Sequence, residues 1–311
     1  MAFFRDEHSV LCMSPKRFLE KVFNEYEQHF GTKPREYSSP ILGGSHPELD
    51  TSKYLDPAGI ERYQSLVGSL QWAVTIGRID IATAVMTLSA FRAAPRKGHL
   101  ECAKRAVGYL HKMKHAVIRV RTDKPDYSDI PKPAHDWLNS VYGNVKEVIP
   151  SDAPEPRGKP VTLTTYVDAN LFHDMLTGRS VTGILHFVNQ MPADWYCKKQ
   201  GTVEAATYGT EIVAARTATD QVINLRNTMR YLGVPVEDHT VMFGDNKLVV
   251  DSVMIPHHKL NKRHHALSFH RVREAVASGM LWFIRIDGKL NPADVLSKHW
   301  STQLYGSTCN P

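Results

Sequence analysis

The sequence predicts an α/β fold: a mixed five-stranded sheet in the order βββαβαβα, preceded by a smaller, mainly helical segment. Three observations favour it. Apolar residues recur at helical spacing between residues 14 and 113. Runs rich in β-branched residues, joined by short connections, follow between residues 160 and 199 and are typical of antiparallel strands. Beyond residue 207, helix-period segments alternate with short apolar runs, as in parallel strands joined by helices.

Length and composition indicate a globular protein of about two domains. The chain has 311 residues, of which 42% are hydrophobic, which is ordinary for a protein with a buried core. Lys and Arg number 38 against 32 Asp and Glu, and the pI is about 9.0, which suits a polyanionic partner without requiring one. We expect a helical segment at 1–121, a proline-rich connector at 122–159, an α/β domain at 160–300 and a tail at 301–311.

The cysteines and the apolar runs indicate in which cellular compartment the protein is expected. Cys12, Cys102, Cys197 and Cys309 are far apart and form no CxxC pair, which disfavours a zinc ribbon or a dense disulfide framework. Scattered thiols indicate a reducing compartment, cytoplasmic or nuclear. We expect no membrane partner, because no apolar run approaches the roughly 20 residues that span a bilayer. The N-terminus lacks the apolar stretch of a signal peptide.

The first segment carries a basic helix. Apolar spacing predicts helices over 14–30, from residue 60, over 79–91 and over 98–113. On the last of these, basic side chains fall opposite the apolar face: Lys97, Lys104, Arg105 and Lys112. Such a face can be merely solvated, or it can follow a phosphate backbone through spaced charges. This stretch by itself leaves both interpretations open.

The second half alternates between strand and helix signals. Strands are predicted at 160–168, 179–188, 193–199, 240–243 and 280–286. Helices are predicted at 207–232, from Asp245 or Asn246, at 265–277 and from Pro292. The first three strands form an antiparallel meander, and the later strands are each preceded by a helix. This is the element order given above.

Four carboxylates occupy similar places in this pattern. Asp168 and Asp245 end strands, Glu211 lies in the first turns of the long helix, and Asp294 lies in the first turn of the last helix. Residues at the carboxyl ends of parallel strands share one crevice, so the four can converge. Converging acids repel unless cations bind, and hard oxygen ligands select Mg²⁺ or Mn²⁺. Two such ions would stabilise the attacking and leaving oxygens of a phosphodiester.

Each acid also has a plainer interpretation. Asp168 can cap a turn, Asp245 a helix, and Asp294 can be a first-turn charge. Glu204 is an alternative to Glu211 as the third ligand. We prefer Glu211 because the residues after it continue the helix and it shares the spacing of the inward-facing side chains. Three further acids are expected on the surface: Asp174, Asp194 and Asp251.

Several motifs, in order and spacing, resemble one family. They include Tyr63–Trp72, Gly77–Val85, Tyr166-Val-Asp-Ala-Asn170, Asp194–Gln200, Tyr208–Ala215, Gly244-Asp-Asn246, Lys262-Arg-His264 and Asn291–Lys298. Over most of its length the chain resembles the C-terminal part of a Ty1/copia-type retrotransposon polyprotein. The first half is similar to the end of the reverse transcriptase, and the second to the ribonuclease H domain.

The resemblance implies a ribonuclease H-like fold and Mg²⁺-dependent hydrolysis of the RNA strand of an RNA–DNA hybrid. It assigns two metal ions and catalysis to Asp168, Glu211, Asp245 and Asp294, an order that disfavours the related integrase fold. The polymerase signature with paired aspartates is absent, so no DNA synthesis is expected. Other parts of the polyprotein are conceivable partners, and the oligomeric state is left open.

The sequence also differs from the ribonuclease H pattern in the position of a histidine. Many ribonucleases H place a histidine before the last helix, but here the loop reads Asp287-Gly-Lys-Leu-Asn291. Five histidines instead cluster between His257 and His270, and the lack of cysteine partners disfavours zinc there. We expect hybrid contacts from Lys97, Lys104, Arg105, Lys112, Arg179, Asn246, Lys262, Arg263 and His264. The rival functions are a non-catalytic hybrid-binding remnant and a relic without a stable product.

Overall fold

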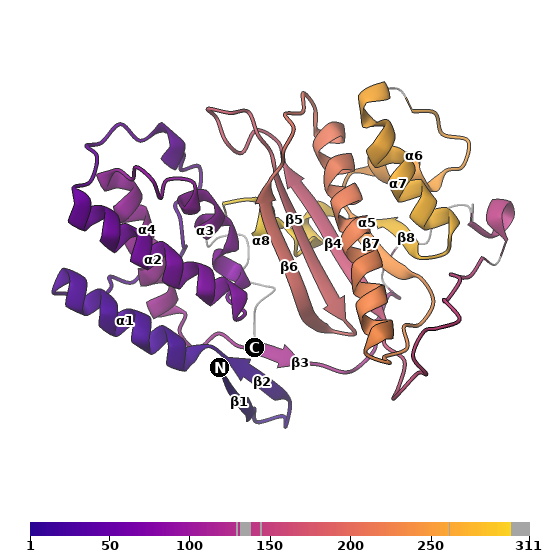
Figure 1. Cartoon of the computed structure of the whole chain (residues 1–311), viewed down its shortest axis with the longest axis horizontal. Helices are drawn as coiled ribbons and strands as arrows, with labels where there is room; N and C mark the ends of the chain where they lie inside the picture. Colours follow the sequence, from indigo (N-terminus) through magenta and orange to yellow (C-terminus); the bar gives the residue numbers. More distant parts are fainter. Residues whose placement is uncertain (129, 131–137, 144, 261, 300–311) are drawn as a thin grey trace. The chain divides into compact units, whose positions relative to one another are not determined.

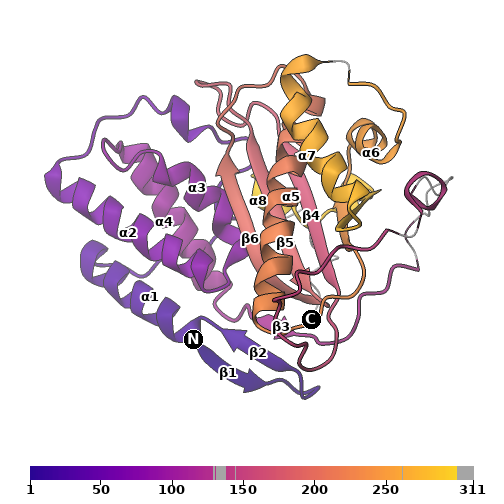
Figure 2. The same ribbon diagram turned by 45° about the vertical axis from the view of Figure 1, so that its right-hand side comes forward.

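A computed structural model describes residues 1–128, 130, 138–143, 145–260 and 262–299 (Figures 1 and 2). The described residues fall into two compact units. The first unit comprises Met1–Val120, Phe172–Gly178 and residues 295–299, and the second comprises Arg121–Leu171 and Arg179–Asp294. The expected tail at 301–311 lies outside the described residues. The domain limits expected from the sequence stay predictions.

The first unit is built mainly from helices. They are α1 (Lys16–Phe30), α2 (Pro57–Thr75), α3 (Ala82–Ser89) and α4 (Lys97–Lys112), with the 3-10 turns η1 (Pro47–Leu49) and η2 (Ile79–Ile81). Asp56 caps α2 by accepting the Gly59 N–H at 2.8 Å, and Pro57 takes the first helical position. The apolar faces of α1, α2 and α4 bury Leu19, Leu70 and Leu110 in one core.

This unit also contains a small sheet that the sequence analysis did not predict. Its strands β1 (Ala2–Arg5), β2 (Leu11–Ser14) and β3 (Ile118–Val120) pair antiparallel in the order β1-β2-β3. The strands are three or four residues long, too short for alternation to be recognised. The partner of β2 lies more than a hundred residues away, at Ile118–Val120.

The second unit contains the predicted five-stranded mixed sheet. Its strands are β4 (Leu163–Asn170), β5 (Val181–Val188), β6 (Met191–Lys199), β7 (Thr240–Gly244) and β8 (Leu281–Arg285). The spatial order is β6-β5-β4-β7-β8, with β4 to β6 antiparallel and β7 and β8 parallel to β4. This is the topology of ribonuclease H, so the predicted fold class is confirmed.

One long helix covers the sheet. Figure 1 and Figure 2 both show α5 (Thr207–Tyr231) lying along β4 and β5, with α7 (Ala266–Ala277) beside it. Further elements are α6 (Lys247–Met254), α8 (Asp294–Ser297), the π-type turn η3 (Leu138–Tyr142) and the 3-10 turns η4 (Arg263–His265) and η5 (Gly288–Leu290). Ala214, Ala215 and Ala218 are fully buried, and such small side chains allow α5 to approach the sheet closely.

Side chains alternate between the two faces of the sheet along each strand, and β7 buries apolar residues on both faces. On β7, Met242 packs into the core beneath α5, whereas Val241 and Phe243 pack on the other face with Tyr127 and Ile130. This burial on both faces keeps β7 inside the sheet, where it pairs with β4. Among the described residues, no helix is long and apolar enough to cross a membrane.

Candidate metal centre

Strand register places two of the predicted acids side by side. Tyr166 of β4 pairs with Phe243 of β7 in the parallel ladder. Asp168 and Asp245 each follow two residues later, so both lie at the same end of the sheet, Asp168 in β4 and Asp245 directly after β7. Asp168 is 1% exposed and Asp245 is half-buried. The two carboxylates come together because parallel strands end at a common edge.

The long helix supplies the third carboxylate. Glu211 is the fifth residue of α5 and is 9% exposed. Ile212 and Ala215, on the same stretch of helix, are fully buried in the core that includes Val167 of β4. This packing directs the first turns of α5 toward the end of β4, where Asp168 lies.

The three carboxylates form one compact group. A ligand oxygen from each of Asp168, Glu211 and Asp245 lies within 4.8 Å of the other two. The donors are all carboxylate oxygens, the hard ligands that suit Mg²⁺ and Mn²⁺. The chemistry and spacing of the group therefore fit the metal ions expected from the sequence.

Asp294 does not belong to the group that meets this distance limit. It is the first residue of α8 and is half-buried. The segment before it reaches the sheet, because Asn291 Nδ2 donates a hydrogen bond to the Val167 main-chain oxygen at 2.9 Å. The assignment of Asp294 as a fourth ligand stays a prediction.

A glycine allows the neighbouring loop to approach the group. A Cβ at Gly288 would lie 3.0 Å from Oδ2 of Asp245, which is tighter than ordinary contact. Gly288 begins η5, within the loop that lacks the expected histidine. The loop backbone therefore lies directly against one of the three carboxylates.

The basic side chains of α4 contact the protein itself. Lys104 pairs with Glu101 at 2.8 Å and lies over the Phe30 ring. Arg105 donates to Ser39 at 3.0 Å and Lys112 donates to Ser38 at 2.8 Å. Lys97 begins the helix and is exposed. The expected nucleic-acid contacts of Lys97, Lys104, Arg105 and Lys112 stay predictions.

The other predicted nucleic-acid contacts lie in the second unit. Asn246 caps α6, accepting hydrogen bonds from the N–H groups of Leu248 at 3.1 Å and Val249 at 3.3 Å. The remaining four side chains are exposed: Arg179, Lys262, Arg263 and His264. Asn246 directly follows Asp245, so this contact would lie next to the carboxylate group.

Two acids lie where the sequence analysis did not expect them. Asp174 was expected on the surface, and this was wrong: it is 6% exposed and accepts N–H hydrogen bonds from Leu176 and Thr177 at 3.1 Å each. Glu204 was considered only as a rival to Glu211. It is 7% exposed and lies beside His264 and His265. Burial lowers the pKa of His265, partly opposed by Glu204.

Comparison with curated proteins shows to which proteins the chain is similar. No protein-family model matches it. It is 25% identical over 296 residues, 93% of its length, to the "Retrovirus-related Pol polyprotein from transposon TNT 1-94" of Nicotiana tabacum. It is 24% identical over 254 residues, 82% of its length, to the corresponding polyprotein from transposon RE1 of Arabidopsis thaliana.

The chain is a distant homologue of Ty1/copia-type Pol polyproteins. It spans 19% of the tobacco relative and 15% of the Arabidopsis one. A shorter relative, "Secreted RxLR effector protein 161" of Plasmopara viticola, is 26% identical over 161 residues and is covered over 89% of its length. The resemblance predicted from the motifs is therefore confirmed as distant homology over most of the chain.

Solved structures of ribonucleases H also match the chain. RNase H1 from Halobacterium salinarum is 15% identical, with a TM-score of 0.35, over 44% of this chain and 94% of that protein. LC11-RNase H1 in complex with an RNA/DNA hybrid is 14% identical, with a TM-score of 0.35, over 44% of this chain and 94% of that protein.

Proposed function

We propose that the α/β domain predicted at 160–300 is a retroelement ribonuclease H that hydrolyses the RNA strand of RNA–DNA hybrids. The observation that carries the proposal is the convergence of Asp168, Glu211 and Asp245, with ligand oxygens within 4.8 Å of one another. They come from β4, α5 and the end of β7, in the predicted order. The distant homology to retrotransposon polyproteins supports the proposal.

The carboxylates would act by holding Mg²⁺ ions, with Mn²⁺ as an alternative. Two bound ions would lower the pKa of the attacking water and stabilise the charge on the leaving oxygen. Asp168 and Asp245 are held by the strand register, and Glu211 by the packing of α5, so the ligands need little reorganisation. We include Asp294, at the start of α8, as the fourth ligand.

The substrate would be held through its backbone. Exposed cations at Arg179, Lys262 and Arg263 offer contacts to phosphates, and Asn246 lies next to Asp245. Such contacts recognise the shape and charge of a hybrid rather than its sequence. Lys97, Lys104, Arg105 and Lys112 of the first unit would add further phosphate contacts.

Cleavage of a labelled RNA–DNA hybrid in Mg²⁺ tests the proposal. The wild-type chain should cut the RNA strand, and chelation by EDTA should abolish cutting. Asp168→Asn should lower the rate at least about 100-fold, because it removes an anionic ligand at the centre of the group. Asp194→Asn is the matched control, since Asp194 is an exposed aspartate of the same sheet outside the metal group.

Duplex DNA and duplex RNA of the same sequence should remain intact. Equal cleavage by wild type and Asp168→Asn would remove the catalytic assignment. The rival function, a remnant that only binds hybrids, would instead give salt-sensitive hybrid binding without cleavage by any variant.

A further inference from the structure

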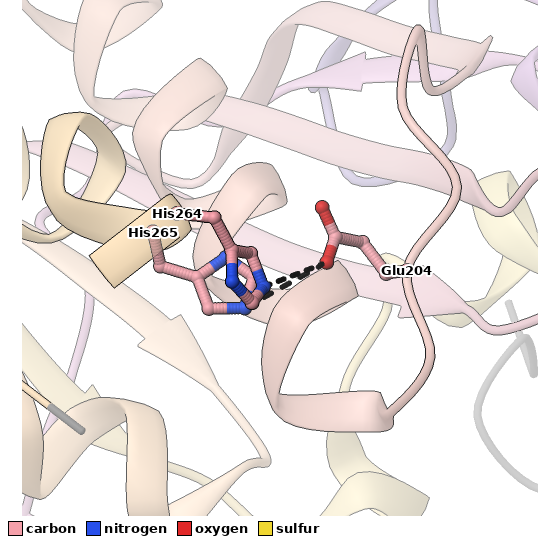
Figure 3. A group of neighbouring side chains, drawn as sticks. All are labelled: Glu204, His264 and His265. Atoms are coloured by element: carbon pink, nitrogen blue, oxygen red, sulfur yellow. Dashed lines mark ion pairs between the residues drawn. The ribbon is translucent and has the colours of Figure 1, made fainter. Parts of the chain in front are cut away.

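Glu204 and the consecutive residues His264 and His265 form a second compact group, separate from the three carboxylates (Figure 3). One ligand atom from each lies within 4.8 Å of the others. Oε2 of Glu204 is 4.0 Å from Nε2 of His264 and 3.6 Å from Nε2 of His265. Glu204 and His265 are buried, whereas the His264 side chain is 64% exposed.

These separations are too long for hydrogen bonds, which bring N and O to about 2.7–3.2 Å. Donor atoms bound to one tetrahedral zinc ion lie about 3.3 Å apart, since each bond to the metal is about 2.0–2.1 Å. The observed spacing of 3.6 and 4.0 Å is closer to that of ligands around a common ion. A small inward movement of the exposed His264 side chain would bring its nitrogen to the distance expected for a zinc ligand.

The two imidazoles converge although they are neighbours in sequence. Consecutive residues of a helix ordinarily point in different directions. Here the rings of His264 and His265 lie with centroids 3.9 Å apart, at the end of η4. Figure 3 shows both rings directed at the same carboxylate oxygen of Glu204.

The surrounding residues orient the group. Oε1 of Glu204 accepts a hydrogen bond from the Thr202 hydroxyl at 3.2 Å, which leaves Oε2 directed at the imidazoles. The Tyr208 ring contacts His265 edge to face, with centroids 5.8 Å apart. A Cβ at Gly209 would lie 2.5 Å from Oε2 of Glu204 and 3.0 Å from Cε1 of His265. A side chain at position 209 would therefore displace the Glu204 carboxylate from its present place.

We propose that Glu204, His264 and His265 bind one zinc ion. Two imidazole nitrogens and one carboxylate oxygen form a ligand set that zinc takes in proteins, with water at the fourth position. The exposed side of His264 leaves that position open to solvent. Glu204 supplies the anionic ligand, so the lack of a nearby cysteine does not exclude zinc.

The two groups differ in the metal that they favour. The group of Asp168, Glu211 and Asp245 offers only hard oxygen donors, which suit Mg²⁺. The group of Glu204, His264 and His265 offers two nitrogens, which suit zinc and other transition metals. Zinc binding at this second group does not require the proposed nuclease activity.

Zinc would join two segments that are far apart in sequence. Glu204 precedes α5, which carries Glu211, and the two histidines precede α7. An ion that binds only the folded chain stabilises it by an amount that grows with the logarithm of the ratio of ion concentration to dissociation constant. Zinc would therefore hold the start of α5 against η4 and stabilise the second unit.

Isothermal titration of the metal-stripped full chain with Zn²⁺, in saturating Mg²⁺, tests the proposal. The Mg²⁺ competes with zinc at the three carboxylates, and the zinc binding that His264→Ala weakens reports the group of Glu204, His264 and His265. His264→Ala and Glu204→Gln should each weaken that binding at least about 10-fold, because each removes a ligand. His270→Ala is the matched control, since His270 is exposed on α7 and lies outside the group.

Crystals soaked in Zn²⁺ provide a second measurement. An anomalous difference peak between Glu204, His264 and His265 would support the site. Equal zinc affinity in wild type and His264→Ala, or a peak only at Asp168 and Asp245, would overturn it. Because the His264 side chain is 64% exposed, its substitution should leave the fold intact, as circular dichroism would verify.

Discussion

Asn291 Nδ2 donates a 2.9 Å hydrogen bond to the main-chain oxygen of Val167, the residue before Asp168. Asn291 is 1% exposed, and its Oδ1 accepts the Ala293 N–H at 3.1 Å. One buried amide thus joins the turn that precedes Asp294 to the strand that carries Asp168. This bond is a direct contact between the segment that leads into α8 and the end of β4.

Asn291→Ala should lower the free energy of unfolding of the second unit by about 1–3 kcal/mol, because it leaves a buried carbonyl without its donor. Urea unfolding monitored by circular dichroism measures the change. Asn227→Ala, on the exposed side of α5, should change stability far less. Equal stability of the two variants would show that the Asn291 bond contributes nothing.

Asp168→Asn should stabilise the metal-free chain while abolishing its response to Mg²⁺. Three carboxylates within 4.8 Å repel one another, and neutralising one should relieve repulsion of about 1 kcal/mol. Thermal unfolding in EDTA should show the higher Tm for the variant. Added Mg²⁺ should then raise the Tm of wild type only. An identical Mg²⁺-dependent increase in both proteins would contradict metal binding at this group.

Two helical glycines of the first unit should respond oppositely to alanine. A Cβ at Gly108 of α4 would lie 1.9 Å from the Arg35 main-chain oxygen, so Gly108→Ala should cost about 1–3 kcal/mol. Gly68 of α2 is exposed, and a Cβ added there would meet nothing within 4 Å, so Gly68→Ala should gain about 0.5–1 kcal/mol. Chemical unfolding of the two variants measures both changes in the free energy of unfolding. A stabilised Gly108→Ala would contradict the close approach of Arg35.

Glu147 should make the second unit sensitive to acid. Burial favours a higher pKa for Glu147, but hydrogen bonds and charge from Arg230 and Arg226 outweigh it and hold the pKa below its usual 4.5. A lowered carboxyl pKa stabilises the fold above the unfolded value. That contribution should be lost as the pH falls below about 4.5, through the folded pKa.

Glu147→Gln tests this network. At pH 7 it should cost about 3–5 kcal/mol, because Arg226, which is 2% exposed, would keep a buried charge without its carboxylate. Its stability should also fall less steeply than that of wild type below pH 4.5. Glu155→Gln is the control, since Glu155 is exposed. The same acid dependence in Glu147→Gln and wild type would exclude Glu147 as its source.

Local patterns predicted most elements of the second unit. The helix expected at 207–232 is α5, Thr207–Tyr231, and the strand expected at 240–243 is β7, Thr240–Gly244. Hydrophobic period, caps and turn residues act within a few positions, so the sequence expresses them directly. The small sheet of β1, β2 and β3 was missed because its pairing depends on a distant partner.

The sequence by itself determined the fold class, the distant relationship to Ty1/copia-type polyproteins and the four acids that could form a metal centre. The tertiary structure decided which of them meet: Asp168, Glu211 and Asp245 share one group, whereas Asp294 lies outside its 4.8 Å limit. It alone brought Glu204 to His264 and His265. The physical reason is that element type follows from neighbours in the chain. The distance between side chains on different elements follows from strand register and helix packing.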